Sequence, residues 1–133
     1  VLAIATVHGC TDVEQATANI LRTLRANGMQ VLPSDFTGHE SEHAASTIVK
    51  LSREHDGITL ICLGPLTNVA VALKLDDGLK RRFEKVVLMG GNYRGTGNVH
   101  SLSTAEYNFH SDPEAAEMVL GQFQVPISVV PWE

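Results

Sequence analysis

The run Val86-Val87-Leu88 constrains the fold of this chain more than any other feature. All three residues are apolar and two are β-branched, which is typical of a strand buried on both faces rather than one that alternates between core and water. The run ends at Gly90-Gly91, and some twenty residues without helical or strand periodicity follow. A loop of that length in a compact domain is more often functional than idle. We therefore predict a buried strand with a functional loop at its carboxyl end.

That loop combines glycines with neutral amides and a carboxylate, including Asn98, Glu106 and Asn108. Amides both donate and accept hydrogen bonds and a carboxylate accepts several, so the set suits recognition of hydroxyl groups. An equally good interpretation from composition alone is a solvated surface loop with Asx turns.

The bulk composition favours one domain, residues 1–133, or part of one. A formal net charge of −5 with scattered basic residues argues against nucleic acid or an anionic membrane surface as partner, and favours a small neutral or cationic ligand. Two distant cysteines, Cys10 and Cys62, indicate neither a disulfide framework nor a zinc site, so we expect a reduced, cytoplasmic protein. No apolar run approaches the roughly twenty residues of a membrane span. Because the chain begins at Val1 rather than Met and ends on a strand, we expect a piece of a longer protein.

Strand and helix patterns alternate along the chain. A capping box formed by Thr11 and Glu14 predicts a helix that stops at Asn27-Gly28, and Asp112-Pro113 predicts another helix start. The predicted strands are Leu2–Val7, Met29–Leu32, Ile58–Leu63, Val86–Leu88 and Val125–Val130; the predicted helices are Thr11–Ala26, Ser41–His55, Pro65–Leu75, Asp77–Phe83 and Asp112–Gly121; and Pro33–Glu42 is expected to be a loop. This alternation predicts a three-layer α/β fold, a mostly parallel sheet with helices on both faces.

Ligands of such sheets bind at the carboxyl ends of the strands. Here those ends are His8–Thr11, Gly64–Thr67, Gly90–His110 and Pro131–Glu133, and we predict that these four segments meet at one edge. His100 and His110, which flank the long loop, are weaker candidates for lining a pocket there.

With these segments side by side, the sequence resembles the inosine-uridine-preferring nucleoside hydrolases. The resemblance lies in motifs that follow one another in family order over nearly the whole chain. They are Thr6-Val7-His8-Gly9, Val13-Glu14-Gln15-Ala16, Gly64-Pro65-Leu66-Thr67-Asn68, Val87-Leu88-Met89-Gly90-Gly91, Gly97-Asn98, Ala105-Glu106-Tyr107-Asn108 and Asp112-Pro113-Glu114-Ala115-Ala116.

The resemblance implies hydrolysis of the N-glycosidic bond of purine or pyrimidine ribonucleosides, with bound Ca²⁺ holding a water and the ribose diol. It further implies that the protein is a homodimer or homotetramer. By position, the Thr67 main-chain carbonyl would ligate Ca²⁺. Asn98 and Glu106 would contact the 5′-hydroxyl, Asn108 the lower ribose hydroxyls, and Met89 would form a wall of the sugar site.

The chain also departs from the family pattern. The Asp-rich motif that supplies the base and two metal ligands would lie before Val1, and a late His-Asp pair would lie beyond Glu133, so no catalytic residue is expected within this chain. Between Met29 and Glu42 the family usually carries a longer segment, so Pro33–Glu42 looks shortened or spliced. Cys10 stands next to the ribose where most members have Asn, and a thiol is a poor substitute for that hydrogen-bonding group. A small buried hydrophobe is the simpler interpretation of Cys10.

Two hypotheses of different classes follow. The first is the central part of a calcium-dependent nucleoside N-ribohydrolase that is inactive on its own, because one carbonyl cannot hold Ca²⁺ without carboxylates. The second is a non-catalytic module that binds a ribosyl ligand or associates with another subunit. A dinucleotide-binding domain is disfavoured because no G-x-G-x-x-G follows the first predicted strand.

Overall fold

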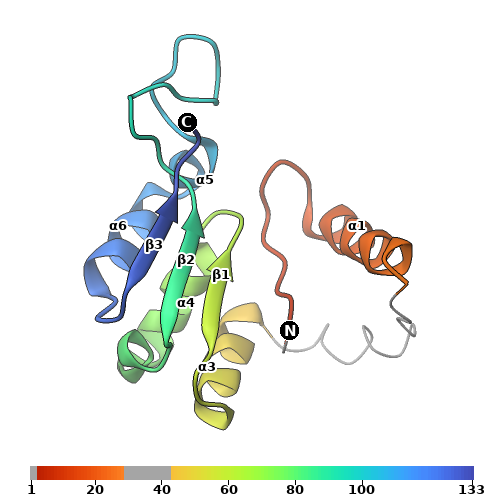
Figure 1. The fold of residues 1–133 in the computed structure, drawn as a ribbon, viewed down its shortest axis with the longest axis vertical. Coiled ribbons are helices and arrows are strands. Elements are labelled where there is room, and N and C mark those ends of the chain that lie inside the picture. The colour runs from red at the N-terminus through yellow and green to blue at the C-terminus, as the bar shows by residue number, and fades with distance from the viewer. Residues whose placement is uncertain (1–2, 29–42) are drawn as a thin grey trace.

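The structure, a computed structural model, describes residues 3–28 and 43–133 (Figure 1). Its centre is a parallel sheet in the order β1-β2-β3, formed by Thr59–Cys62, Lys85–Met89 and Ile127–Val130. Leu60 of β1 pairs with Val86 of β2, which pairs with Ile127 of β3. The three strands predicted between residues 58 and 130 are therefore present, and they run parallel as expected.

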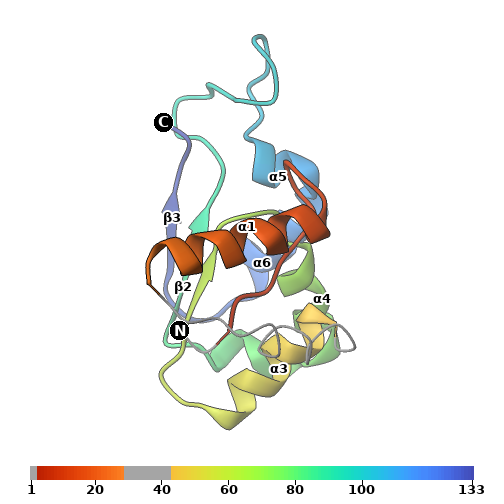
Figure 2. The same cartoon turned by 90° about the vertical axis from the view of Figure 1, so that its right-hand side faces the viewer.

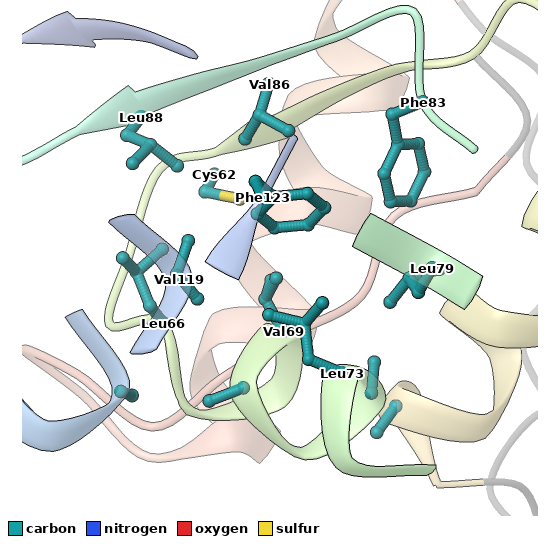
Figure 3. Packing of buried hydrophobic residues seen from close by; sticks show 14 of the residues in the cluster. Cys62, Leu66, Val69, Leu73, Leu79, Phe83, Val86, Leu88, Val119 and Phe123 are labelled. Carbon is teal, nitrogen blue, oxygen red and sulfur yellow. The ribbon is translucent and has the colours of Figure 1, made fainter. Parts of the chain in front are cut away.

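Three helices pack against one face of this sheet (Figures 1 and 2). They are α3 (Ala44–Glu54), α4 (Thr67–Leu75) and α6 (Pro113–Gln122), with the 3₁₀ helix η1 (Asp77–Arg81) between α4 and β2 and the short α5 (Tyr107–Ser111) before α6. Figure 3 shows the core between the strands and these helices. The best buried large side chains there are those of Leu66, Leu79, Val86, Leu88 and Val119.

The opposite face of the sheet is open among the described residues. Ile61 in β1 is 60% exposed, Met89 in β2 is 44% exposed and Val130 in β3 is 54% exposed. Successive strand residues point to opposite faces, which explains why Val86 and Leu88 are buried while Met89 is not. We predicted helices on both faces of the sheet. In the part of the chain that the structure describes, helices cover one face, and the other face is exposed.

The amino-terminal region lies beside β1 and apart from the sheet (Figure 1). Residues 3–7, predicted as most of a strand, form no strand, because no neighbouring strand pairs with them. A hydrogen bond from Asn68 Nδ2 to the Thr6 carbonyl at 3.0 Å connects this segment to α4. Helix α1 (Val13–Ala26) follows and buries none of its residues fully.

Helix starts differ from the predicted ones by at most three residues. Asp12, not Thr11, caps α1, because its carboxylate accepts the Gln15 N–H at 2.7 Å. His43 caps α3 through Nδ1, which accepts the Ala45 N–H at 3.2 Å. Asp112 caps α6 as predicted, accepting the Ala115 N–H at 3.0 Å.

Other predicted boundaries shift as well. Helix α4 begins at Thr67 rather than at Pro65, and α6 runs past Gly121 to Gln122, since Gly121 does not adopt the positive φ of a helix stop. Gly28 does adopt it, with φ of 73°, directly after α1. The predicted strand Met29–Leu32, the loop 33–42 and the Ser41 cap lie outside the described residues.

Candidate functional site

The carboxylate of Glu106 is the centre of a hydrogen-bonded network at the carboxyl end of β2. Its side chain is buried, with 7% of the residue exposed. Oε1 accepts the Asn108 N–H at 3.0 Å, and Oε2 accepts the N–H groups of Phe109 at 3.1 Å and Gly91 at 2.9 Å. Glu106 therefore caps α5 and ties that helix to the turn that follows β2.

Asn108 makes the second link between α5 and the sheet. It is buried, and its Nδ2 donates a hydrogen bond to the Met89 carbonyl at 2.9 Å. The Met89 side chain lies on the open face of the sheet and is 44% exposed. The predicted sugar-wall residue thus meets Asn108 through its main chain, while its side chain is accessible from the other face.

Asn98 joins the same network from the middle of the long loop. Its Oδ1 accepts the Tyr107 N–H at 2.7 Å, and its own N–H donates to the Ala105 carbonyl at 3.0 Å. Gly97 is required beside it, because a Cβ on Gly97 would lie only 2.2 Å from the Ala105 oxygen. The structure therefore brings Asn98, Glu106 and Asn108 together. The loop was expected to lack a helix, but its last residues form α5.

A cavity of about 470 Å³ opens beside these residues. Glu106 is the predicted site residue that lines it, and His110 also reaches it, whereas His100 is exposed and its Nδ1 accepts the Leu102 N–H at 3.4 Å. The lining residues are Gly91, Asn92, Ala105, Glu106, Phe109, His110 and Pro113.

Thr67 lies at the start of α4, at the carboxyl end of β1. Its hydroxyl donates a hydrogen bond to Oδ2 of Asp112, so that the first residue of α4 contacts the cap of α6. The role of the Thr67 carbonyl as a Ca²⁺ ligand stays a prediction.

The described residues do not fit a Ca²⁺ ion by themselves. Calcium takes six to eight oxygen ligands, with several carboxylates among them. Among residues 3–28 and 43–133, no cluster of three or more His, Cys, Asp or Glu side chains could hold a metal ion. The Asp112 carboxylate, which accepts the hydrogen bond of the Thr67 hydroxyl, does not make such a cluster with other described residues.

The two cysteines are in opposite environments. Cys10 is exposed in the turn before α1, so the prediction of a small buried residue is wrong there. The adjacent Gly9 lies near the Gly64-Pro65 turn, as a Cβ on Gly9 would be 3.6 Å from Pro65. Cys62 is buried in β1 as predicted, and desolvation raises the pKa of its thiol to about 12.

Glu133 is a second carboxylate of the network that we did not predict. Its side chain accepts the main-chain N–H groups of Tyr93, Arg94 and Thr96. Desolvation favours the protonated form of this carboxyl, but the three donated hydrogen bonds outweigh it and hold the pKa of Glu133 below its ordinary value. The sequence pattern predicted that Pro131–Glu133 lies at the carboxyl edge of the sheet. This position is the signal from which a role of Glu133 in the site could have been predicted.

A parallel sheet with a polar loop network at the carboxyl ends of its strands defines an α/β protein with a candidate ligand site at that edge. The chain belongs to the family described as inosine-uridine preferring nucleoside hydrolase, whose profile matches residues 27–133. This confirms the family resemblance that the motifs indicate, and the parallel sheet with helices confirms the α/β fold class.

Individual relatives agree with this assignment. The pyrimidine-specific ribonucleoside hydrolase of Escherichia coli O139:H28 is 44% identical over 81 residues, which are 60% of this chain and 25% of that protein. The crystal structure of the inosine-uridine preferring nucleoside hydrolase of Bacillus anthracis is similar with a TM-score of 0.62 and 30% identity, over 67% of this chain and 30% of that one. A plant nucleoside hydrolase is similar with a TM-score of 0.77 and 25% identity, over 99% of this chain and 51% of that one.

The matched region spans about a quarter to a third of the length of the curated relatives. Each helix in the part of the chain that the structure describes is too short or too polar to cross a lipid bilayer.

Proposed function

We propose that this chain belongs to a hydrolase that cleaves the N-glycosidic bond of ribonucleosides, and that its 90–110 segment binds the ribose. The observation that supports this proposal is the convergence of Asn98, Glu106 and Asn108 in one hydrogen-bonded network beside a cavity. Relatives named as ribonucleoside hydrolases support the reaction class.

The carboxylate of Glu106 is suited to bind a sugar hydroxyl. A carboxylate offers about four lone-pair positions, and three main-chain N–H groups already use Oε1 and Oε2. These donors fix the orientation of the side chain, while the remaining lone-pair position can accept a hydrogen bond from a sugar hydroxyl. We propose that Glu106 and Asn98 contact the 5′-hydroxyl and that Asn108 contacts the lower hydroxyls, with Met89 beside the sugar.

The negative charge of Glu106 also has a role in the reaction that we propose. Cleavage of a glycosidic bond builds positive charge on the sugar ring in an oxocarbenium-like transition state. A fixed carboxylate near the ring stabilises that charge more than it stabilises the neutral substrate, and only such a difference raises the rate.

Calcium dependence is a proposal about the whole protein. When bound in such a site, calcium would orient a water and the ribose diol. The described residues do not supply its ligand set, so carboxylates outside them would be needed.

The test is an assay of ribose release from inosine and from uridine. We expect turnover by the full-length gene product that contains these residues, and none by the 133-residue chain alone. In the full-length protein, Asn108→Ala should lower kcat/KM at least about 100-fold. Glu117→Gln, a change of an exposed residue on α6, should leave it unchanged. Absence of ribose release from both nucleosides by the full-length protein would contradict the proposal.

The open apolar face of the sheet favours a second candidate, a subunit-association module. Ile61, Met89 and Val130 expose apolar surface there, and such surface is often covered by a partner.

We propose a homodimer or homotetramer whether the chain is catalytic or an association module. We also propose a cytoplasmic location, which the two free cysteines support. Sedimentation equilibrium of the wild-type protein and of Ile61→Glu tests this candidate, which a monomeric wild type would contradict.

A further inference from the structure

The side chain of Glu133 receives three main-chain N–H groups from one turn of the long loop. Tyr93 donates to Oε2 at 3.1 Å, Thr96 donates to Oε1 at 3.3 Å, and Arg94 donates to the same Oε1 atom. Hydrogen bonds to an ionised acceptor are about twice as strong as bonds between neutral groups.

Glu133 reaches this turn because the end of β3 continues alongside the segment after β2. The Gly90 N–H donates to the Val130 carbonyl at 3.1 Å, and the Trp132 N–H donates to the Gly91 carbonyl at 3.0 Å. These two bonds extend the β2–β3 pairing beyond the strands and bring Glu133 next to residues 93–96.

The turn has little else to order it. Tyr93 is 85% exposed, and Arg94, Gly95 and Thr96 are exposed as well, so apolar packing does not hold it. Gly95 has a φ of 73°, a left-handed conformation that restricts the residue type but supplies no contact. The Glu133 carboxylate therefore supplies the main interactions that we find for this turn.

The turn lies between the two halves of the candidate site. On one side, Gly91 donates its N–H to Glu106, and on the other side Asn98 accepts the Tyr107 N–H. Only Gly97 separates residues 93–96 from Asn98. A change in the conformation of this turn would therefore displace Asn98 relative to Glu106.

We propose that Glu133 is a positioning residue that orders residues 91–98 through its bonds to the 93–96 amides and so holds Asn98 in place beside Glu106. Its effect on substrate rests on the proposed function; its effect on the loop does not.

The first experiment is amide hydrogen exchange on the full-length protein. Glu133→Ala should speed exchange of the Tyr93, Arg94 and Thr96 amides at least about tenfold, because each loses a charge-assisted bond. Glu133→Gln, which has the same shape and keeps one acceptor oxygen, should give a smaller increase. Glu117→Gln, which removes an exposed carboxylate on α6, should leave these amides unchanged. Unchanged exchange in Glu133→Ala would overturn the inference.

The second experiment asks whether the order of the loop serves the site. Inosine and 5′-deoxyinosine are compared as substrates, since only inosine carries the hydroxyl that Asn98 and Glu106 are proposed to bind. Glu133→Ala should lower kcat/KM for inosine about tenfold or more and change it little for 5′-deoxyinosine. An equal loss for both substrates would indicate a general structural defect and would overturn the assigned role.

The two proposals fail in different ways. A full-length wild-type protein that hydrolyses neither substrate refutes the proposed function, and the exchange experiment then decides the inference about Glu133. A protein that hydrolyses inosine but shows unchanged exchange in Glu133→Ala keeps the function and refutes the inference.

Discussion

The side-chain amide of Asn108 donates a hydrogen bond to the main-chain carbonyl of Met89 at 2.9 Å, and so fastens α5 to the end of β2 across 19 positions of sequence. Both partners lie at the carboxyl edge of the sheet, next to the Glu106 carboxylate. This bond makes the loop network part of the fold rather than an appendage to it, so changes in the network should alter stability as well as activity.

Replacement of Asn108 by Ala should lower the free energy of unfolding by about 1–3 kcal/mol, because the buried Asn108 side chain is lost and the part-buried Met89 carbonyl loses its donor. Asn27→Ala is the control, since the Asn27 side chain also donates to a carbonyl, that of Thr23 at 2.8 Å, but at an exposed position. Urea unfolding should show a loss of less than about 1 kcal/mol for the control. Equal losses in both variants would contradict the role of Asn108.

Two glycines should respond to alanine in opposite directions. Gly97→Ala should destabilise the protein by about 1 kcal/mol or more, since the new Cβ would lie 2.2 Å from a main-chain oxygen of Ala105. Gly121→Ala should stabilise it by about 0.5–1 kcal/mol, because Gly121 is in the last turn of α6 and an added Cβ would meet no atom within 4 Å outside its chain neighbours and the helix backbone. Thermal melts of the two variants check the signs, and a stabilised Gly97→Ala would refute the close approach at that position.

Thiol labelling should separate the two cysteines. Cys10 is exposed and should react with a thiol reagent in the folded protein, whereas Cys62 is buried with a pKa of about 12 and should react only after unfolding. Mass spectrometry of peptides labelled at neutral pH, with and without denaturant, checks this. Labelling of Cys62 in the native protein at the rate of Cys10 would contradict its burial in β1.

Stability should fall in acid partly through Asp76. Hydrogen bonds from the guanidinium groups of Arg82 and Arg53 hold the pKa of Asp76 well below its ordinary value of 3.8. The charged form is favoured by folding, so this contribution is complete above the ordinary pKa and is lost as pH falls from about 4 toward the lower folded-state pKa.

Asp76→Asn should therefore lower stability at pH 6 and lower it less at pH 3. Asp77→Asn is the matched control, because Asp77 is exposed and pairs with the neighbouring Lys80 on η1. Urea unfolding of the wild type and both variants at the two pH values measures the difference. An Asp76→Asn effect that is equal at pH 3 and pH 6 would refute the linkage.

The sequence by itself determined the pieces whose signals are local. Asp112 and Pro113 begin α6 as predicted, Gly28 stops α1, and the runs around Leu60 and Val86 form parallel strands. These features depend on residues within about four positions of each other or on simple periodicity, and a linear pattern contains that information.

Only the tertiary structure decided which groups meet. Residues 3–7 are apolar and β-branched enough to suggest a strand, yet a strand exists only where another strand pairs with it. Helix α5 is too short to show a period, and it forms where the Glu106 carboxylate accepts the N–H groups of its first turn. Likewise, Glu133 reaches the amides of residues 93–96 because β3 pairs with β2, a relation between distant segments that no local pattern contains.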